Sequence, residues 1–393
     1  MLRGKNILLG VGGGIAAYRT AELARLLIKQ GAEVRCVMTR SACEFITPLS
    51  FQALTGEKVH TELFDLTSEQ AMGHIQLARW ADAIIIAPAT AGVISRLAHG
   101  IADDLLSTIM LVAKIPVLLA PAMNPSMWHA DATRANVISL KQRGMAFIGP
   151  TCGELACGES GAGRLSEPSA IISDLLSLLT NKQLVGERWV INAGPTIEAW
   201  DEVRTLSNRA TGTLGALLAS QTAMMGADVT LIAGPGTPLS HPSVKRVDVE
   251  SAAEMLTACQ SAGQGAQVFI GTAAVSDFRF AQRSKGKIKR GDTHLMQVEL
   301  LANPDIIAEI AHLEKRPVKV IAFAAEAKNH TKNARIKLLK KGVDAVIAND
   351  ISNMGAAKGG GWFLSHEHEI KLNSGSKQML AEAIIDQIIG LDI

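Results

Sequence analysis

The chain has 393 residues, and 48 % of them are hydrophobic, which is enough apolar material for two domain cores. Charged residues make up 19 %, which excludes a disordered chain, and 39 basic against 37 acidic residues leave a net charge of +2. This balance argues against nucleic acid, a membrane or an acidic macromolecule as partner. Five scattered cysteines with no secretory signal before them indicate free thiols in a reducing cytoplasm.

The first half of the chain alternates strands and helices. An apolar run over 6–11 ends in glycines and is followed by a helical pattern over 15–30 and a β-rich run over 33–38, which is the βαβ unit of a parallel sheet. Further strands are predicted over 83–87 and 117–120, and further helices over 94–113, 130–143 and 168–179. Continuous apolar strands of this kind are typical of a sheet covered on both faces.

The pattern lapses before residue 188 and then restarts. We therefore predict two domains, 1–187 and 188–393, joined by a short linker. Strands of the second domain are predicted over 188–192, 226–232, 267–271, 318–323 and 345–348, and helices over 213–225, 251–262, 304–313, 329–341 and 377–389. The fold class is α/β, with two doubly wound domains and mainly parallel sheets.

The first glycine loop is a candidate phosphate site. Gly12, Gly13 and Gly14 stand between a strand and a helix, where backbone N–H groups can bind an anion. The acid that NAD sites carry after the second strand is missing, and Thr39 and Ser41 stand there instead. A mononucleotide phosphate is therefore favoured over NAD, and a tight turn without ligand is an equal alternative.

Other polar clusters of the first half follow buried strands. In Pro88-Ala89-Thr90 a proline is expected to end the strand, and in the Pro-Ala-Met123-Asn124 string an amide stands beside an apolar wall. Cys157 lies on a glycine-rich flap over 149–164 with no metal-like spacing, and His74 is a lone histidine. Each of these has a plain structural reading when taken alone.

The second half has three polar clusters. A small-residue loop after a strand carries Asp277, and the segment 283–290 holds five positive charges with no acid, which favours a triphosphate over a polynucleotide. Asn303 precedes Pro304 and is expected to cap the helix that follows.

Together these strings resemble a known family. The glycine loop leading into Tyr18, His74, the Pro-Ala-Thr string, the segment 97–104, the Asn124 string and the Cys157 flap resemble the flavin-dependent cysteine decarboxylases. The second half resembles phosphopantothenate–cysteine ligase, so the whole chain is similar to the fused enzymes of coenzyme A biosynthesis. The resemblance implies a flavodoxin-like flavin domain followed by a Rossmann-like ligase domain.

For the first half the resemblance implies FMN and the conversion of 4′-phosphopantothenoylcysteine to 4′-phosphopantetheine. His74 is then the base or carboxylate partner, Asn124 the hydrogen-bonding clamp and Cys157 the proton donor. The expected FMN-binding residues are Gly12, Gly13, Gly14, Thr39, Ser41, Pro88, Ala89, Thr90 and Met123. A departure at Ala91-Gly92, where the family often has Ala-Asn, affects a flavin or subunit contact.

For the second half the resemblance implies CTP with Mg²⁺, and ligation of cysteine to 4′-phosphopantothenate through an acyl-cytidylate. Asn208 is the implied catalytic amide and Lys287 a catalytic cation. The expected CTP-binding residues are Gly271, Thr272, Ala273, Asp277, Lys287, Asn303, Pro304, Asp305, Ile306, Phe323, Lys337 and Lys341. The family's usual Ser-Ser-Gly-Lys after the catalytic Asn reads Ala210-Thr211-Gly212-Thr213 here, which favours an altered ligase rate.

The resemblance also implies a homo-oligomer, with trimeric flavin domains and dimeric ligase domains. Three alternatives stay open: an active decarboxylase with a degenerate ligase, a non-catalytic flavin-binding regulator, and nucleic-acid binding through 283–290. Retention of His74, Asn124 and Cys157 argues against the regulator.

Overall fold

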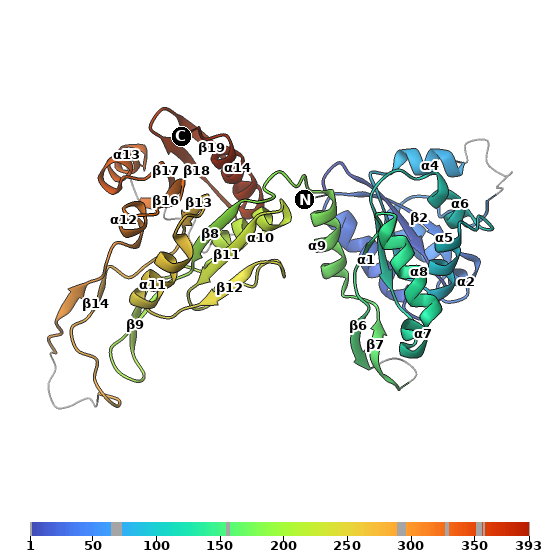
Figure 1. Ribbon diagram of the computed structural model, residues 1–393, viewed down its shortest axis with the longest axis horizontal. Coiled ribbons are helices and arrows are strands. Elements are labelled where there is room, and N and C mark those ends of the chain that lie inside the picture. Colours follow the sequence, from blue (N-terminus) through green and yellow to red (C-terminus); the bar gives the residue numbers. More distant parts are fainter. Residues whose placement is uncertain are drawn as a thin grey trace. The chain divides into compact units, whose positions relative to one another are not determined.

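The structure is a computed structural model that describes residues 2–63, 73–154, 158–288, 296–326, 330–350, 356 and 358–392. The chain divides into two compact units, unit 1 (Met1–Thr180) and unit 2 (Asn181–Ile393), drawn in Figure 1 from blue to green and from green to red. The division precedes the predicted one at 187 because Leu184 is buried in the core of unit 2. Its amide also donates to the carbonyl of Met225 at 3.0 Å.

Within its described residues, unit 1 is built on a five-stranded parallel sheet with the order β2-β1-β3-β4-β5. The strands are β1 Asn6–Val11, β2 Glu33–Met38, β3 Ala83–Ala89, β4 Val117–Pro121 and β5 Ala146–Phe147. This order reverses direction between β1 and β3, which is the switch point at which flavodoxin-like sheets bind ligands.

Helices cover both faces of this sheet. Alternate side chains of β1 enter different cores, with Ile7 and Leu9 packing on one face and Leu8 on the other. The first face is covered by α1 Ala17–Lys29, α3 Pro48–Thr55 and α9 Pro168–Leu179. The second face is covered by α4 His74–Trp80, α5 Ala91–His99, α6 Leu105–Val112 and α8 Asp131–Gln142. The remaining elements are α2 Arg40–Cys43, α7 Pro125–His129, β6 Thr151–Glu154 and β7 Ser160–Arg164.

Two local predictions for unit 1 are wrong. The helix expected over 94–113 is two helices. Gly100 ends α5 with φ +68°, and Asp104 is the N-cap of the next helix, α6. Pro88 does not end its strand, since β3 continues through it to Ala89 with a cis Ala87–Pro88 bond.

The described part of unit 2 contains an eight-stranded sheet with the order β12-β11-β8-β13-β16-β17-β18-β19. Its first six strands are parallel, and β18 and β19 form an antiparallel hairpin that the sequence analysis did not predict. The bounds are β8 Arg188–Ala193, β11 Asp228–Ala233, β12 Lys245–Asp248, β13 Val268–Gly271, β16 Lys319–Glu326, β17 Ala345–Asp350, β18 Lys358–Ser365 and β19 Glu369–Ser376. Direction reverses between β8 and β13, as in a Rossmann-like sheet.

Both faces of the second sheet are also covered, so both units are doubly wound as predicted. One face packs against α10 Thr213–Met224 and α14 Lys377–Ile389, and the other against α11 Ala252–Gly263, α12 Ile306–Ala311 and α13 His330–Lys341. An arm projects from this body in Figure 1, made of β9 Ile197–Ala199, β10 Thr205–Ser207, β14 Phe278–Phe280 and β15 Leu300–Ala302. Among the described residues, no helix has the length and apolar character needed to cross a membrane.

Candidate functional site

The glycine loop of unit 1 lies at the β1/β3 switch point, packed against two other candidate segments. A Cβ on Gly12 would lie 2.3 Å from the Pro88 carbonyl oxygen, and a Cβ on Gly13 would lie 2.3 Å from the Ser41 Cβ. These two glycines are therefore required by close packing alone. A Cβ on Gly14 would meet only the Thr90 Cγ2, at 3.6 Å, so this end of the loop has room. The structure thus brings the loop together with Pro88, Ser41 and Thr90.

The hydroxyl groups around this loop have different surroundings. Thr39 is buried, and its hydroxyl donates to the Val11 carbonyl at 3.3 Å and accepts from the Ala42 amide at 3.2 Å, which caps α2. Thr90 caps α5 by accepting from the Val93 amide at 3.4 Å. Ser41 is exposed, so its hydroxyl is the one most open to a ligand.

Asn124 lies where the loop after β4 meets the β6–β7 hairpin, which we call the flap. Its Oδ1 accepts from the Ser126 amide at 2.8 Å and caps α7, and its Nδ2 donates to Glu159 at 2.7 Å. The Met123 amide donates to the carbonyl of Gly163 at 3.0 Å. These bonds hold the flap against the Asn124 loop. Cys157, the implied proton donor, lies outside the described residues.

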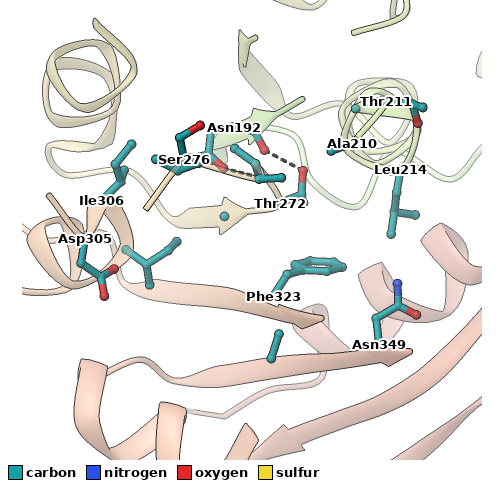
Figure 2. Close-up of a pocket in the computed structure, with 18 of the residues that line it drawn as sticks. Asn192, Ala210, Thr211, Leu214, Thr272, Ser276, Asp305, Ile306, Phe323 and Asn349 are labelled. Carbon is teal, nitrogen blue, oxygen red and sulfur yellow. Dashed lines mark hydrogen bonds between the residues drawn. The ribbon is translucent and has the colours of Figure 1, made fainter. Parts of the chain in front are cut away.

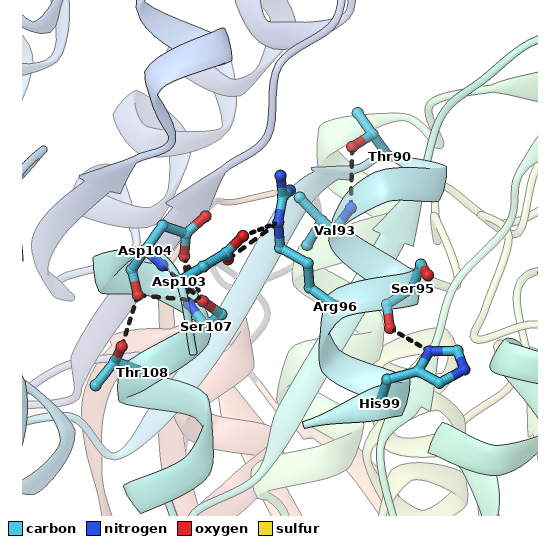
Figure 3. Close-up of polar contacts among 9 residues, drawn as sticks. All are labelled: Thr90, Val93, Ser95, Arg96, His99, Asp103, Asp104, Ser107 and Thr108. Carbon is cyan, nitrogen blue, oxygen red and sulfur yellow. Dashed lines mark hydrogen bonds and ion pairs between the residues drawn. The ribbon is translucent and has the colours of Figure 1, made fainter. Parts of the chain in front are cut away.

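Other family-like strings of unit 1 have structural roles. Asp104 accepts from the Ser107 amide at 2.7 Å and completes a capping box for α6, while Asp103 pairs with Arg96 at 3.1 Å (Figure 3). His74 is half-buried and is the first residue of α4.

A cavity of about 590 Å³ opens in unit 2, lined by residues from the β8/β13 switch point. Figure 2 shows Phe323 and Asn349 across the cavity from Asn192 and Thr272. Every predicted CTP-binding residue except Lys287 lines it: Gly271, Thr272, Ala273, Asp277, Asn303, Pro304, Asp305, Ile306, Phe323, Lys337 and Lys341. The lining also includes the glycine-containing loop over 210–215 at the start of α10.

Amide side chains organise the loop over 271–277. Asn192 is 1 % exposed, and its Oδ1 accepts from the Ala273 amide at 3.1 Å while its carbonyl accepts from the Thr272 hydroxyl at 2.6 Å. Asn208 donates to the carbonyls of Ala274 and Val275 at 3.0 and 3.1 Å. The sequence analysis missed Asn192 because its strand ends in an ordinary Asn-Ala-Gly turn.

The helix that follows this loop begins later than predicted. Asp305, not Asn303, caps α12 by accepting from the Ala308 amide at 3.2 Å. Asn303 instead donates from its Nδ2 to the Ser276 carbonyl at 2.8 Å. The prediction failed because Asn and Asp flank Pro304 and both are good caps.

Charge in the cavity is partly balanced within the protein. The Lys341 ammonium lies 2.8 Å from Asp305, and Lys337 donates to the Phe323 carbonyl at 2.7 Å. Burial raises the pKa of Asp305, but the hydrogen bond and charge of Lys341 outweigh it, so this pKa is lowered overall. No cluster of three His, Cys, Asp or Glu side chains suited to a metal occurs in the described ranges.

The basic segment 283–290 is described as far as Ile288 and is attached to the arm by its backbone. The Ser284 amide donates to the Trp200 carbonyl at 2.9 Å, and the Ile288 amide donates to Asp201 at 3.0 Å. Arg204 donates to the Ile288 carbonyl at 3.1 Å. Lys287 is not brought to the cavity lining.

Asp201 is the centre of this attachment. The residue is 1 % exposed, and its side chain also accepts from the amides of Val203 and Arg204, both at 2.7 Å. Burial raises the pKa of this carboxyl, but three backbone amides and the Arg204 guanidinium lower it overall.

Two doubly wound sheets, each with a polar site at its switch point, define a two-domain α/β enzyme with separate sites for small molecules. Residues 1–180 match the Flavoprotein family model, and residues 184–391 match the model "DNA/pantothenate metabolism flavoprotein C-terminal domain".

Known proteins match across the full chain. The chain is 45 % identical over 398 residues to the coenzyme A biosynthesis bifunctional protein CoaBC of Haemophilus influenzae, covering 99 % of this chain and 98 % of the relative. It is 42 % identical to the protein of the same name from Vibrio cholerae, covering 98 % of each. A crystal structure of the C-terminal domain of CoaBC matches at 30 % identity and a TM-score of 0.46, covering 53 % of this chain and 96 % of that one. The chain belongs to the family of coenzyme A biosynthesis bifunctional proteins, and it is a bifunctional enzyme with a decarboxylase and a ligase domain.

Proposed function

We propose that unit 2 ligates cysteine to 4′-phosphopantothenate with CTP, and that unit 1 decarboxylates the resulting 4′-phosphopantothenoylcysteine with FMN. The observation that carries the ligase assignment is the convergence of the predicted CTP residues on one cavity of about 590 Å³. That volume is typical of small-molecule sites.

FMN fits the switch point of unit 1. The Gly14 end of the loop has space for a close ligand, it opens the 13-residue helix α1, and the exposed Ser41 and the Thr90 loop lie beside it. Helix α2 starts directly after Thr39, so no acid stands where a dinucleotide site needs one. When bound, FMN supplies the oxidation and reduction that the side chains cannot.

The protein's own residues position the substrate and supply a proton. Asn124 holds the substrate by hydrogen bonds, and its contact with Glu159 keeps the flap at this loop. Cys157 on the same flap donates a proton from Sγ to the enethiol product carbon after carbon dioxide has left. His74 serves as base or carboxylate partner.

In the ligase reaction the carboxylate of 4′-phosphopantothenate attacks the α-phosphate of CTP, forming an acyl-cytidylate and releasing pyrophosphate. The cysteine amine then displaces CMP. Asn208 acts on the acyl-cytidylate, and Lys287 stabilises charge on the leaving pyrophosphate. Mg²⁺ binds mainly through phosphate oxygens.

We also propose a cytoplasmic homo-oligomer, with dimeric ligase and trimeric flavin domains. Exposed apolar side chains on the arm of unit 2 support the dimer, namely Val203, Leu206, Phe278, Leu300 and Leu301. Exposed Ile15 and Tyr18 of unit 1 support a second contact between copies.

The flavin proposal is tested by the purified protein itself. We expect flavin bands in the visible spectrum, and we expect mass spectrometry of the released cofactor to identify FMN. Release of FAD or NAD would overturn it. Cys157→Ser should still release carbon dioxide but lose 4′-phosphopantetheine formation by about 100-fold, because a hydroxyl is a much weaker acid than a thiol.

The ligase proposal is tested by CTP-dependent pyrophosphate release with 4′-phosphopantothenate and no cysteine. We expect release by the wild type and none by Lys287→Gln, with the flavin spectrum unchanged. No release by the wild type would favour a degenerate ligase, the alternative raised by Thr213, which places no cation in the loop over 210–215.

A further inference from the structure

Three lysines line the cavity of unit 2, and two of them are engaged within the protein. Lys341 pairs with Asp305, and Lys337 donates to the Phe323 carbonyl. Lys377, the third, forms no hydrogen bond or ion pair with any residue that the structure describes. A cation therefore lines the cavity without a counter-charge among the described groups.

The position of Lys377 is unfavourable for a cation that has no anion beside it. It is the first residue of the 13-residue helix α14, which Ser376 caps, and the positive end of a helix dipole disfavours an ammonium there. Lys377 is half-buried, and burial lowers the pKa of its ammonium. An anion bound in the cavity would relieve both effects.

The neighbouring phosphate-type loop lacks a cation of its own. Residues 210–215 line the same cavity at the start of the 12-residue helix α10, and none of them is basic. Helices α10 and α14 pack together, and Gln221 of α10 donates to the carbonyl of Gln378 in the first turn of α14 at 3.1 Å. Residues 210–215 at the start of α10 and Lys377 at the start of α14 both line the one cavity.

We propose that Lys377 is a further nucleotide-binding residue, which contacts the phosphate chain of a nucleoside triphosphate seated on the loop over 210–215. This inference rests on the proposed ligase function and adds a residue to that site. Lysine binds phosphate as a compact charge, so the contact depends on the phosphates and not on the base.

The test compares two ligands on the full-length protein. Dissociation constants for CTP with Mg²⁺ and for cytidine are measured by calorimetry for the wild type and for Lys377→Gln. We expect Lys377→Gln to weaken CTP binding about 10- to 100-fold and to leave cytidine binding unchanged. Lys377→Arg should retain most of the CTP affinity. Lys371→Gln is the matched control, because Lys371 is an exposed lysine of β19, and it should bind CTP as the wild type does.

Other outcomes distinguish a failure of this inference from a failure of the proposed ligase function. If the wild type binds CTP and Lys377→Gln binds it equally well, or loses cytidine and CTP in equal measure, Lys377 has no phosphate contact. If the wild type binds no CTP and releases no pyrophosphate, the ligase proposal fails and this inference fails with it. Lys377→Met, which keeps the aliphatic stem, repeats the comparison should the glutamine variant not fold.

Discussion

Two neighbouring glycines of the unit 1 loop are expected to differ sharply in their tolerance of alanine. Gly12→Ala would place a methyl group 2.3 Å from the Pro88 carbonyl, whereas Gly14→Ala would meet only a methyl group at 3.6 Å. We predict that Gly12→Ala lowers the free energy of unfolding by about 2 kcal/mol and reduces bound flavin. Urea denaturation and flavin absorbance measure both effects. Equal stability of the two variants would contradict the packing described here.

Asp201 is predicted to position Lys287 through the amide of Ile288. Asp201→Asn replaces one acceptor oxygen by a donor, so we expect CTP-dependent pyrophosphate release to fall about tenfold. Urea titration of the same variant separates this loss from a general effect on folding, because release should fall in a protein that is still folded under the assay conditions.

The charge state of this anchor follows from its lowered pKa. The folded-state pKa of Asp201 lies below the ordinary 3.8, so its contribution to stability is complete above that value. The contribution is lost as the pH falls through the lower folded value. Assays near neutral pH therefore compare a fully charged Asp201 with Asn.

Adjacent aspartates between α5 and α6 are expected to differ in their effect on helix stability. Asp104 caps α6 and forms a capping box with Ser107, whereas Asp103 forms an exposed ion pair with Arg96. Asp104→Ala should lower the free energy of unfolding by about 1 kcal/mol. Asp103→Ala should change it by at most about 0.5 kcal/mol. Urea titrations of both variants check the difference, and a larger loss from Asp103→Ala would contradict the cap assignment.

At the level of elements, strands were the most predictable part of the fold. Parallel strands covered on both faces are continuous apolar runs, as in 83–87 and 117–120, and their ends share one sheet edge. That is why the predicted loops of unit 2 meet in one cavity. The break at Gly100 escaped prediction because apolar residues on both sides keep a helical pattern.

The remaining site residues depend on elements that sequence patterns do not reveal. Lys377 reaches the cavity because β18 and β19 return the chain to the sheet as a hairpin. The start of β18, Lys-Gly-Gly-Gly, has no strand-like alternation, so this return could not be predicted. For Lys287 the reverse holds. Its charge can be identified from the sequence, whereas the arm that fixes its backbone cannot.

At the level of the whole molecule, the two cores predict where the chain can be divided. Leu184 is buried in the core of unit 2, and Lys182 donates to the Met224 carbonyl at 2.6 Å. The free energy of unfolding of a fragment that starts at 181 should therefore be about 2 kcal/mol higher than that of a fragment that starts at 188. Leu184→Ala in the longer fragment serves as the control and should remove most of that difference. Equal stabilities would place the boundary at 187.

The attachment of the basic segment to the arm has a consequence for protein engineering. Its anchors are the amides of Ser284 and Ile288 and the carbonyl of Ile288, groups that most amino acids provide. The side chains between the anchors can then be exchanged without releasing the backbone, provided that proline is kept out of positions 284 and 288. The segment is thus a natural place for a library in which every charge but that of Lys287 is varied while the scaffold stays fixed, and such a library would measure how the neighbouring charges affect the pyrophosphate release proposed above.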